Sequence, residues 1–245
     1  DLRQDRVHHH QQADGDRRAG GDRPGGDLRG QRLRGRVRQH LRDRQHRLHG
    51  HDARLLDFRP DAEGNLAVYG ASGSGKSSFL RTIAIAAGFT VRGGPCHVYG
   101  LDFGNRGLAM LESLPHVGSV INGADHERVA RLLRTLRQTI DDRAVRYSAA
   151  NAASITEYRQ ITGDRDEPRI FVLVDGLTAF RNAYESAGAL MKWLDAFTSL
   201  LADGRPVGVH FVLSVDARNG LPVAMDSSVQ SRFVLRMATE DDYSF

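Results

Sequence analysis

Apolar residues follow two alternating patterns along residues 55–245. Short continuous apolar runs are typical of strands covered on both faces, and stretches with apolar positions three or four residues apart are typical of amphipathic helices. The runs predict strands at residues 55–58, 66–69, 97–101, 117–121, 169–175, 209–214 and 233–237. The amphipathic stretches predict helices at residues 78–87, 107–113, 125–140, 154–160, 177–185, 187–201 and 226–231. This alternation predicts an α/β fold in which a mostly parallel central sheet carries helices on both faces.

Residues 1–54 lack both patterns. They hold 14 Arg and 8 Asp, a net charge of +6, together with seven of the 11 His and no aromatic residue. So few apolar side chains cannot offset the entropy lost on ordering, so we expect a disordered or irregular low-complexity tail and a domain that starts near residue 55. Three interpretations of the tail stay open: a solvated segment, a basic arm that contacts nucleic acid or acidic partners, and a translation that is not authentic protein.

The rest of the chain is close to electrically neutral. Residues 55–245 hold 20 Lys+Arg and 22 Asp+Glu, a net charge of −2, although the whole chain carries +4. The overall charge is therefore no argument that this domain binds nucleic acid. The single cysteine, Cys96, excludes a disulfide framework. Because no apolar run approaches about 18 residues and no signal-peptide pattern is visible, we expect a cytoplasmic chain or a cytoplasmic piece of a larger one.

The C-terminal end predicts one more helix. Thr239 precedes three acidic residues, which suits a helix N-cap and first turn. The chain stops at Phe245, inside this predicted helix, so we expect the domain of residues 55–245 to be truncated at its C-terminus.

The strand at 66–69 leads into a glycine-rich loop with a strong chemical signal. Residues 70–77 read GASGSGKS and match G-x-x-x-x-G-K-[ST], the phosphate-binding loop of nucleoside triphosphatases. Glycines let successive backbone N–H groups point at phosphate oxygens, and the following helix adds the positive end of its dipole. The alternative is a glycine-rich turn with an incidental lysine. The residues expected to bind ATP are Gly70, Ala71, Ser72, Gly73, Ser74, Gly75, Lys76, Ser77 and Ser78.

Four polar side chains have predicted roles of their own in this site. Lys76 is expected to reach the β- and γ-phosphates, and the Ser77 hydroxyl to ligate Mg²⁺. Asp175 ends a continuous apolar run, at the sheet edge where open α/β folds bind ligands. It is the expected Mg²⁺ ligand and, in that role, a catalytic residue. Its alternative is an ordinary strand-end turn residue. Ser214 ends another predicted strand and is either a γ-phosphate sensor or a plain strand-end serine.

Five stretches of the chain together have the pattern of one family: residues 70–80, 99–104 (YGLDFG), 114–118 (LPHVG), 171–176 (FVLVDG) and 208–213 (GVHFVL). Through them residues 55–245 resemble the FtsK/SpoIIIE-type ATPases, and most closely the tandem ATPase domains of the type VII (ESX) secretion motor. The resemblance implies a RecA-like P-loop fold, ATP with Mg²⁺ as ligands, and neighbouring ATPase domains or subunits as partners. It also implies secreted protein as cargo and a membrane contact made only through another domain or chain.

The sequence departs from the pattern of a vigorous motor at one position. Active members of the family carry Glu directly after the Mg²⁺ aspartate, where it positions the attacking water; here the residue is Gly176. Asp102 ends a neighbouring strand and is a candidate substitute, with a turn-forming role as its alternative. Arg232 is a candidate finger that reaches a neighbouring subunit's nucleotide, with a plain surface arginine as its alternative.

Three functions are consistent with these features. The first is a Mg-ATP-binding ATPase domain of a type VII secretion-like motor with weak or regulatory hydrolysis. The second is a DNA-translocating ATPase of the same superfamily, which the neutral charge of residues 55–245 and Gly176 disfavour. The third is a degenerate P-loop module that docks a partner and does not hydrolyse ATP.

Overall fold

The computed structural model describes residues 58–89 and 95–243. The predicted tail, residues 1–54, and the domain boundary at residue 55 lie outside these ranges and stay predictions. Of the strand predicted at 55–58 only Phe58 is described, and it is not in a strand. None of the described helices is long and apolar enough to cross a membrane.

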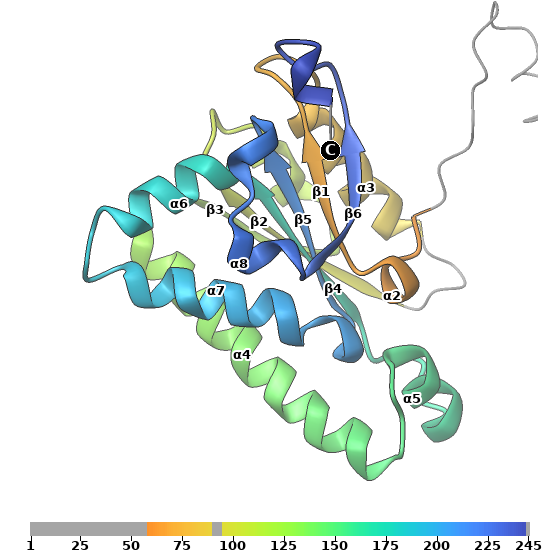
Figure 1. Ribbon diagram of the computed structural model, residues 1–245. Coiled ribbons are helices and arrows are strands. Elements are labelled where there is room, and N and C mark those ends of the chain that lie inside the picture. The colour runs from red at the N-terminus through yellow and green to blue at the C-terminus, as the bar shows by residue number, and fades with distance from the viewer. Residues whose placement is uncertain (1–57, 90–94, 244–245) are drawn as a thin grey trace, which may run out of the picture. The chain divides into compact units, whose positions relative to one another are not determined.

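Within the described residues the sheet has six parallel strands in the order β3-β2-β4-β5-β1-β6 (Figure 1). The strands are β1 (Asn65–Tyr69), β2 (Cys96–Asp102), β3 (Val117–Asn122), β4 (Arg169–Asp175), β5 (Val209–Val215) and β6 (Val229–Val234). Because all strands run the same way, their carboxyl ends lie at one edge, with β5 between β1 and β4. The predicted fold class is confirmed.

Helices and short 3₁₀ turns connect the strands. The helices are α2 (Pro60–Glu63), α3 (Lys76–Gly88), α4 (His126–Ala149), α5 (Ile155–Thr162), α6 (Leu177–Glu185), α7 (Met191–Asp203) and α8 (Val223–Asp226). The 3₁₀ turns are η1 (Ala109–Ser113), η2 (Arg205–Val207), η3 (Arg218–Gly220) and η4 (Asp241–Tyr243).

Side chains of each strand alternate between two apolar layers. Leu66 and Val68 of β1 face α3, where they pack with Leu80. Ala67 and Tyr69 of the same strand face the layer that contains α4, α6, α7 and α8. This alternation follows from the pleat of a strand, and it gives the sheet the predicted helices on both faces (Figure 1).

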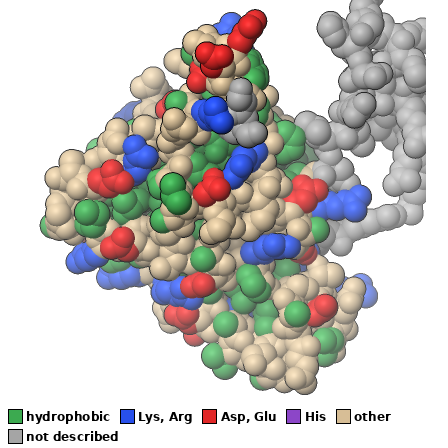
Figure 2. All heavy atoms as spheres, viewed as in Figure 1, with side chains coloured by type: hydrophobic (Ala, Val, Ile, Leu, Met, Phe, Trp, Pro, Cys, Tyr) green, Lys and Arg blue, Asp and Glu red, His purple; other side chains and the backbone are tan. Residues whose placement is uncertain are grey.

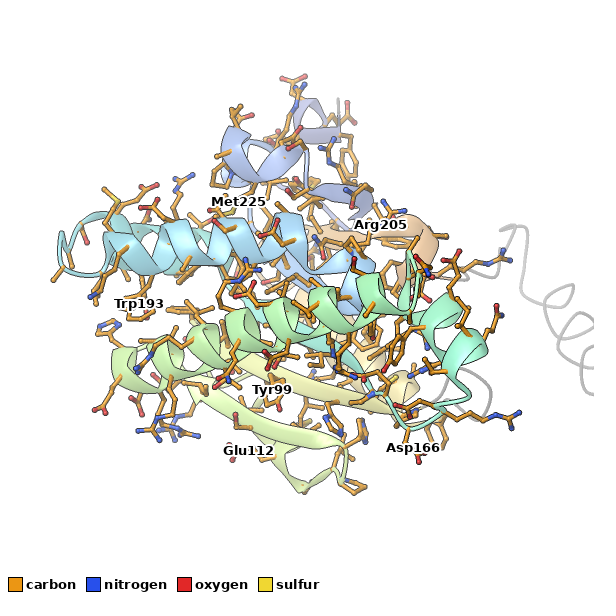
Figure 3. All side chains as sticks on the ribbon, turned by 90° about the horizontal axis from the view of Figure 1, so that it is seen from below. Tyr99, Glu112, Asp166, Trp193, Arg205 and Met225 are labelled. Atoms are coloured by element: carbon orange, nitrogen blue, oxygen red, sulfur yellow. The ribbon has the colours of Figure 1, made fainter. Side chains whose placement is uncertain are left out.

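The apolar stripe predicted on the helix from residue 125 is buried as a whole. It consists of Val129, Leu132, Leu133, Leu136 and Ile140. Asp125 caps this helix, α4, because its carboxylate accepts the N–H of Arg128. In Figure 3, α4 and α7 lie side by side with Trp193 between them, and the guanidinium of Arg134 lies 5.7 Å from the centre of the indole ring.

The prediction was wrong for the end of the sheet. Residues 226–231 were expected to be helical and residues 233–237 to form a strand, but α8 ends at Asp226 and β6 begins at Val229. The reason is long-range: the buried Asn65 side chain donates to the carbonyl of Ser228 at 2.8 Å, and the Gln230 side chain accepts the N–H of Asn65. These contacts fix where β6 starts to pair with β1, and local residue patterns do not report them.

Other boundaries differ in smaller ways. Residues 60–63 form α2 where a turn was expected, residues 109–113 form a 3₁₀ turn, and α7 begins at Met191 rather than at residue 187. Near the C-terminus the described helical structure is the single turn η4. The Thr239 hydroxyl donates to the Asp242 carboxylate at 2.9 Å instead of accepting a backbone N–H as an N-cap would.

The LPHVG stretch at residues 114–118 has a packing role. The ring of His116 lies under α3, with its Nε2 atom 2.8 Å from the carbonyl oxygen of Ala84. A Cβ atom at Gly88 would lie 2.5 Å from that ring, and one at Gly118 would lie 2.5 Å from the ring of Tyr99. The two glycines therefore let α3 and β3 approach these rings closely.

A buried ion network joins α4 to the chain that enters β4. Glu167 accepts from Arg143 Nε at 2.8 Å and from Arg146 at 2.6 Å. The Arg143 guanidinium also donates to the carbonyl oxygens of Val207 and Pro168. Burial lowers the pKa of Arg143, against the Glu167 carboxylate, which raises it. The carboxylate therefore compensates an arginine charge that is almost fully removed from water.

We predict that Glu167→Gln lowers the free energy of unfolding by about 3 kcal/mol, because it leaves the Arg143 charge buried without its counter-ion. Urea unfolding followed by circular dichroism measures this value. The matched control is Glu185→Gln, which removes a partly exposed ion pair with Arg181 and is expected to cost within about 0.5 kcal/mol. Equal effects of the two substitutions would contradict the role of the network.

A second polar cluster lies at the amino-terminal ends of β4 and β5. His210 is fully buried, and its Nε2 atom lies 3.3 Å from Asp61. Asp61 is also paired with Arg169. Burial lowers the pKa of His210, helped by the Arg169 and Arg205 charges, and Asp61 opposes this shift. The pKa of Asp61 is well below its usual range because its hydrogen bonds to Arg169, His210 and Thr156 outweigh burial, the largest single influence, which raises it.

We predict that stability falls as the pH falls below about 6.5. The unfolded chain then takes up a proton at His210 that the folded protein excludes, and near pH 4 the same applies to Asp61. The measurement is the free energy of unfolding between about pH 7.5 and pH 5.5, where one such group contributes at most about 1.4 kcal/mol per pH unit. His210→Gln should flatten the slope, whereas His97→Gln, at an exposed site on β2, should not. An unchanged slope in His210→Gln would contradict the assignment.

Candidate nucleotide-binding site

The glycine-rich loop between β1 and α3 is fixed by backbone hydrogen bonds at its start. The N–H of Gly70 donates to the carbonyl of Val215 at 3.1 Å, and the N–H of Ala71 donates to the carbonyl of Arg236 at 2.9 Å. The N–H of Ser74 donates back to Ala71 and closes the turn. The loop is therefore held between the end of β5 and the segment that follows β6.

The middle of the loop is open above its glycines. Gly73 has φ +72° and Gly75 has φ +103°, in the region that favours glycine. A Cβ atom at either position would meet nothing within 4 Å, so conformation and not crowding requires glycine there. The Ser74 hydroxyl oxygen is buried and has no hydrogen-bond partner within the described part of the chain. The open backbone at Gly73 and Gly75 suits a phosphate group, whereas the buried Ser74 hydroxyl lies on the side of Gly70.

Lys76 folds back across the same loop. Its side chain is 9% exposed, and Nζ donates to the carbonyl oxygens of Gly70 at 2.6 Å and Ala71 at 2.9 Å. Nζ also lies 3.0 Å from the carboxylate of Asp216, directly after β5. The sequence did not single out Asp216, because only the strand order brings the end of β5 beside the loop.

The next residue connects the loop to β4. The Ser77 hydroxyl donates to Oδ2 of Asp175 at 2.6 Å, although 98 residues separate the two. The two side chains expected to ligate Mg²⁺ are therefore in direct contact at the carboxyl edge of the sheet. A hydroxyl and a carboxylate are oxygen ligands of the kind that Mg²⁺ binds together with phosphate and water. Among residues 58–89 and 95–243, no group of three or more His, Cys, Asp or Glu side chains could hold a metal without such help.

Ser214 lies behind Asp175 in the buried layer. Its hydroxyl donates to Asp175 Oδ1 at 2.8 Å and accepts the N–H of Gly176 at 2.7 Å. Both atoms of the Asp175 carboxylate are thus held, one by Ser77 and one by Ser214. In this geometry the Ser214 hydroxyl orients the Asp175 carboxylate and does not point toward a phosphate directly.

Gly176 itself has a backbone conformation that disfavours a side chain. Its φ is +89°, and a Cβ atom would lie 3.4 Å from the backbone carbon of Phe103. A glutamate at this position would require a strained backbone or a local rearrangement. Glycine at position 176, in place of glutamate, therefore goes together with a backbone conformation that disfavours any side chain.

Asp102 ends β2 and lies close to Asp175, but both oxygens of its carboxylate already accept hydrogen bonds from the loop that follows β2. Oδ1 accepts the N–H of Gly104 at 3.1 Å and Oδ2 accepts the N–H of Leu108 at 2.9 Å. The side chain is 3% exposed. The loop that it holds lies against the metal-ligand pair, since a Cβ atom at Gly107 would be 2.9 Å from Asp175 Oδ2. In this structure Asp102 has the turn-forming arrangement.

The remaining predicted residues lie around this centre. Ser72 is exposed, and the Ser78 hydroxyl accepts from Arg81 at 2.7 Å. Arg232 lies within β6 opposite Ala67, away from the carboxyl edge, and its guanidinium pairs with Asp226 at 2.6 Å. The structure therefore brings together the loop, Lys76, Ser77, Asp175 and Ser214. Arg232 lies away from them, and its role toward a neighbouring subunit's nucleotide stays a prediction.

Comparisons with known proteins identify the family to which the chain is similar. A family model described as "FtsK/SpoIIIE family" matches residues 31–244. The chain is 31% identical over 184 residues to the ESX-4 secretion system protein EccC4 of Mycobacterium tuberculosis, across 74% of this chain and 14% of that protein. It is 24% identical over 185 residues to the type VII secretion system protein EssC of Staphylococcus aureus, across 74% of this chain and 12% of that protein.

The fold has a solved counterpart. A structure of Thermomonospora curvata EccC, described as "ATPases 2 and 3" in complex with a signal sequence peptide, superposes with a TM-score of 0.64 at 27% identity. The match covers 76% of this chain and 35% of that one. The chain therefore spans about a third or less of each of these three relatives.

We predict that Ser214→Ala lowers the Mg²⁺-dependent affinity for ATP by about 10- to 100-fold, because it frees one oxygen of the Asp175 carboxylate. Titration of a fluorescent ATP analogue with Mg²⁺, and again with EDTA, measures the effect. Binding in EDTA should be unchanged. The control is Ser199→Ala on α7, whose hydroxyl donates to the carbonyl of Asp195 in its own helix. An equal loss of affinity with and without Mg²⁺ would contradict the role given to Ser214.

Proposed function

Because the chain belongs to the FtsK/SpoIIIE family, we propose that it is an ATPase domain of a type VII secretion-like motor that binds Mg-ATP and hydrolyses it slowly. The observation that carries this proposal is the contact of Ser77 with Asp175 beside an open glycine loop. A phosphate cradle and a pair of oxygen ligands at one sheet edge are the minimum that a nucleotide with its metal requires.

Each group in the site has a distinct task in this proposal. The backbone N–H groups of the loop, residues 70–75, and the amino-terminal end of α3 hold the phosphates. The Lys76 ammonium group exchanges its contacts with the loop carbonyls and Asp216 for contacts with the phosphate oxygens. Ser77 and Asp175 hold Mg²⁺, which when bound neutralises charge that develops on the phosphate oxygens.

The slow rate in this proposal follows from Gly176. Without a carboxylate directly after Asp175, the usual group that orients the attacking water is missing, and orientation contributes several orders of magnitude to such reactions. ATP would then act mainly as a ligand that stiffens the domain and its contacts, with hydrolysis as a slow reset.

The proposed partners are neighbouring ATPase domains and a secreted protein. The solved EccC chain is named as two ATPases with a signal sequence peptide, and this chain resembles one such unit in extent. We place the domain on the cytoplasmic side, with any membrane contact made through another domain or chain.

DNA translocation has weaker support. Figure 2 shows Lys and Arg side chains interspersed with Asp and Glu on the face drawn, with acidic side chains gathered over η4. A protein that tracks duplex DNA is expected to present a continuous basic surface. If DNA stimulated hydrolysis of ATP, the DNA-translocating ATPase would be favoured over the secretion-type domain.

We predict that Lys76→Ala lowers the affinity for Mg-ATP by about 100-fold, because charge-assisted hydrogen bonds contribute about 1.5–3 kcal/mol each. Equilibrium binding of a fluorescent ATP analogue to the 245-residue chain measures this. The matched control is Lys192→Ala, which removes the only other lysine, an exposed side chain on α7.

Turnover of ATP by the same preparations separates the alternatives. Slow turnover that is indifferent to linear duplex DNA supports the secretion-type domain, and stimulation by a helical-hairpin secretion substrate would strengthen it. Stimulation by DNA with a steep salt dependence favours the translocase. Tight ATP binding without turnover favours a docking module, and no binding at all would remove the proposal.

A further inference from the structure

Asp216 is an acidic residue of the candidate site that the recognised motifs leave without a role. It directly follows β5, the strand between β1 with its glycine loop and β4 with Asp175. Its Oδ1 atom lies 3.0 Å from Lys76 Nζ, and its side chain is 56% exposed. Asp216 therefore lies at the open edge of the sheet, beside the lysine expected to contact the β- and γ-phosphates.

The other acids at this edge are already engaged. The Asp175 carboxylate is held by two serine hydroxyls, and the Asp102 carboxylate is held by two backbone N–H groups of its own loop. Within the described part of the chain, the only partner of the Asp216 carboxylate is Lys76. When a phosphate replaces it as the counter-ion of Lys76, Asp216 becomes a free carboxylate at the reacting end of the nucleotide.

We propose that Asp216 is the catalytic carboxylate that orients the attacking water and accepts its proton, in place of the missing carboxylate at Gly176. This assignment rests on the proposed function, since it concerns hydrolysis of ATP bound in the same loop. A carboxylate suits the task because it accepts a hydrogen bond from water and raises the electron density on its oxygen.

The step is a displacement at the γ-phosphorus. The water oxygen forms a new bond to phosphorus, the bond from phosphorus to the bridging oxygen breaks, and ADP leaves with that electron pair. The proton that the water loses passes through the Asp216 carboxylate to solvent. The products are ADP and inorganic phosphate, and no other reactant is required.

The ion pair with Lys76 has a second consequence for binding. ATP has to displace Asp216 from Lys76, and the carboxylate then remains beside negatively charged phosphate oxygens. Removing its charge should therefore tighten binding of ATP while it slows hydrolysis. The affinity for ADP, which lacks the γ-phosphate, should increase less than the affinity for ATP. A residue that only supports the fold would not change these two quantities in opposite directions.

The test uses single-turnover hydrolysis of radiolabelled ATP by the 245-residue chain, with nucleotide affinities measured by fluorescence. Asp216→Asn should slow hydrolysis by about 100-fold and bind ATP a few-fold more tightly than the wild type. Asp216→Glu, which keeps the carboxylate, should retain more activity than Asp216→Asn. The matched control is Asp203→Asn, a 51% exposed aspartate paired with Arg137, which should leave both quantities unchanged.

Three results would overturn the assignment. One is hydrolysis by Asp216→Asn at the wild-type rate, and another is a wild-type rate no higher than that of Lys76→Ala. In the first case the role of Asp216 fails while slow hydrolysis of tightly bound ATP leaves the proposed function standing. In the second case the role of Asp216 fails as well, and tight ATP binding without turnover favours the docking module. The third is a parallel loss of ATP affinity and melting temperature in Asp216→Asn, which would show a structural role. If the wild-type chain binds no ATP, the proposed function and the assignment fail together.

Discussion

The hydrogen bond between the Ser77 hydroxyl and the Asp175 carboxylate is the contact on which the functional account depends. Neither residue alone is strong evidence for a metal site, since serine after a lysine and aspartate at a strand end are both common. Their contact is a consequence of strand order, because parallel strands bring their carboxyl ends to one edge and only β5 separates β1 from β4. The same edge places a glycine loop, a lysine and two oxygen ligands within one small volume.

Strand order also separates the acids of this edge into different tasks. Asp175 is held from both sides and is oriented to accept a cation, whereas Asp102 stabilises the turn after β2. Among the residues that the structure describes, Asp216 is paired only with Lys76, which a phosphate would recruit. Gly176, with its positive φ, adds no side chain. Three carboxylates at one sheet edge therefore differ in function because their hydrogen-bond partners differ.

Local pattern was sufficient for much of this structure. Continuous apolar runs located β4 and β5, the stripe on α4 was buried as predicted, and the loop motif located Lys76 and Ser77. What the sequence could not supply depends on contacts between distant segments. The start of β6 is set by Asn65, more than 160 residues earlier. The surroundings of Ser214 and Asp216 were likewise not readable before the neighbours of β5 were known.

The most direct test of the central claim is a crystal structure with a non-hydrolysable ATP analogue and Mn²⁺ in place of Mg²⁺. The account predicts a single strong anomalous peak between the Ser77 hydroxyl and the Asp175 carboxylate, with the phosphates over the loop glycines and Lys76 turned toward them. Nucleotide bound elsewhere, or an ion that contacts neither side chain, would contradict it.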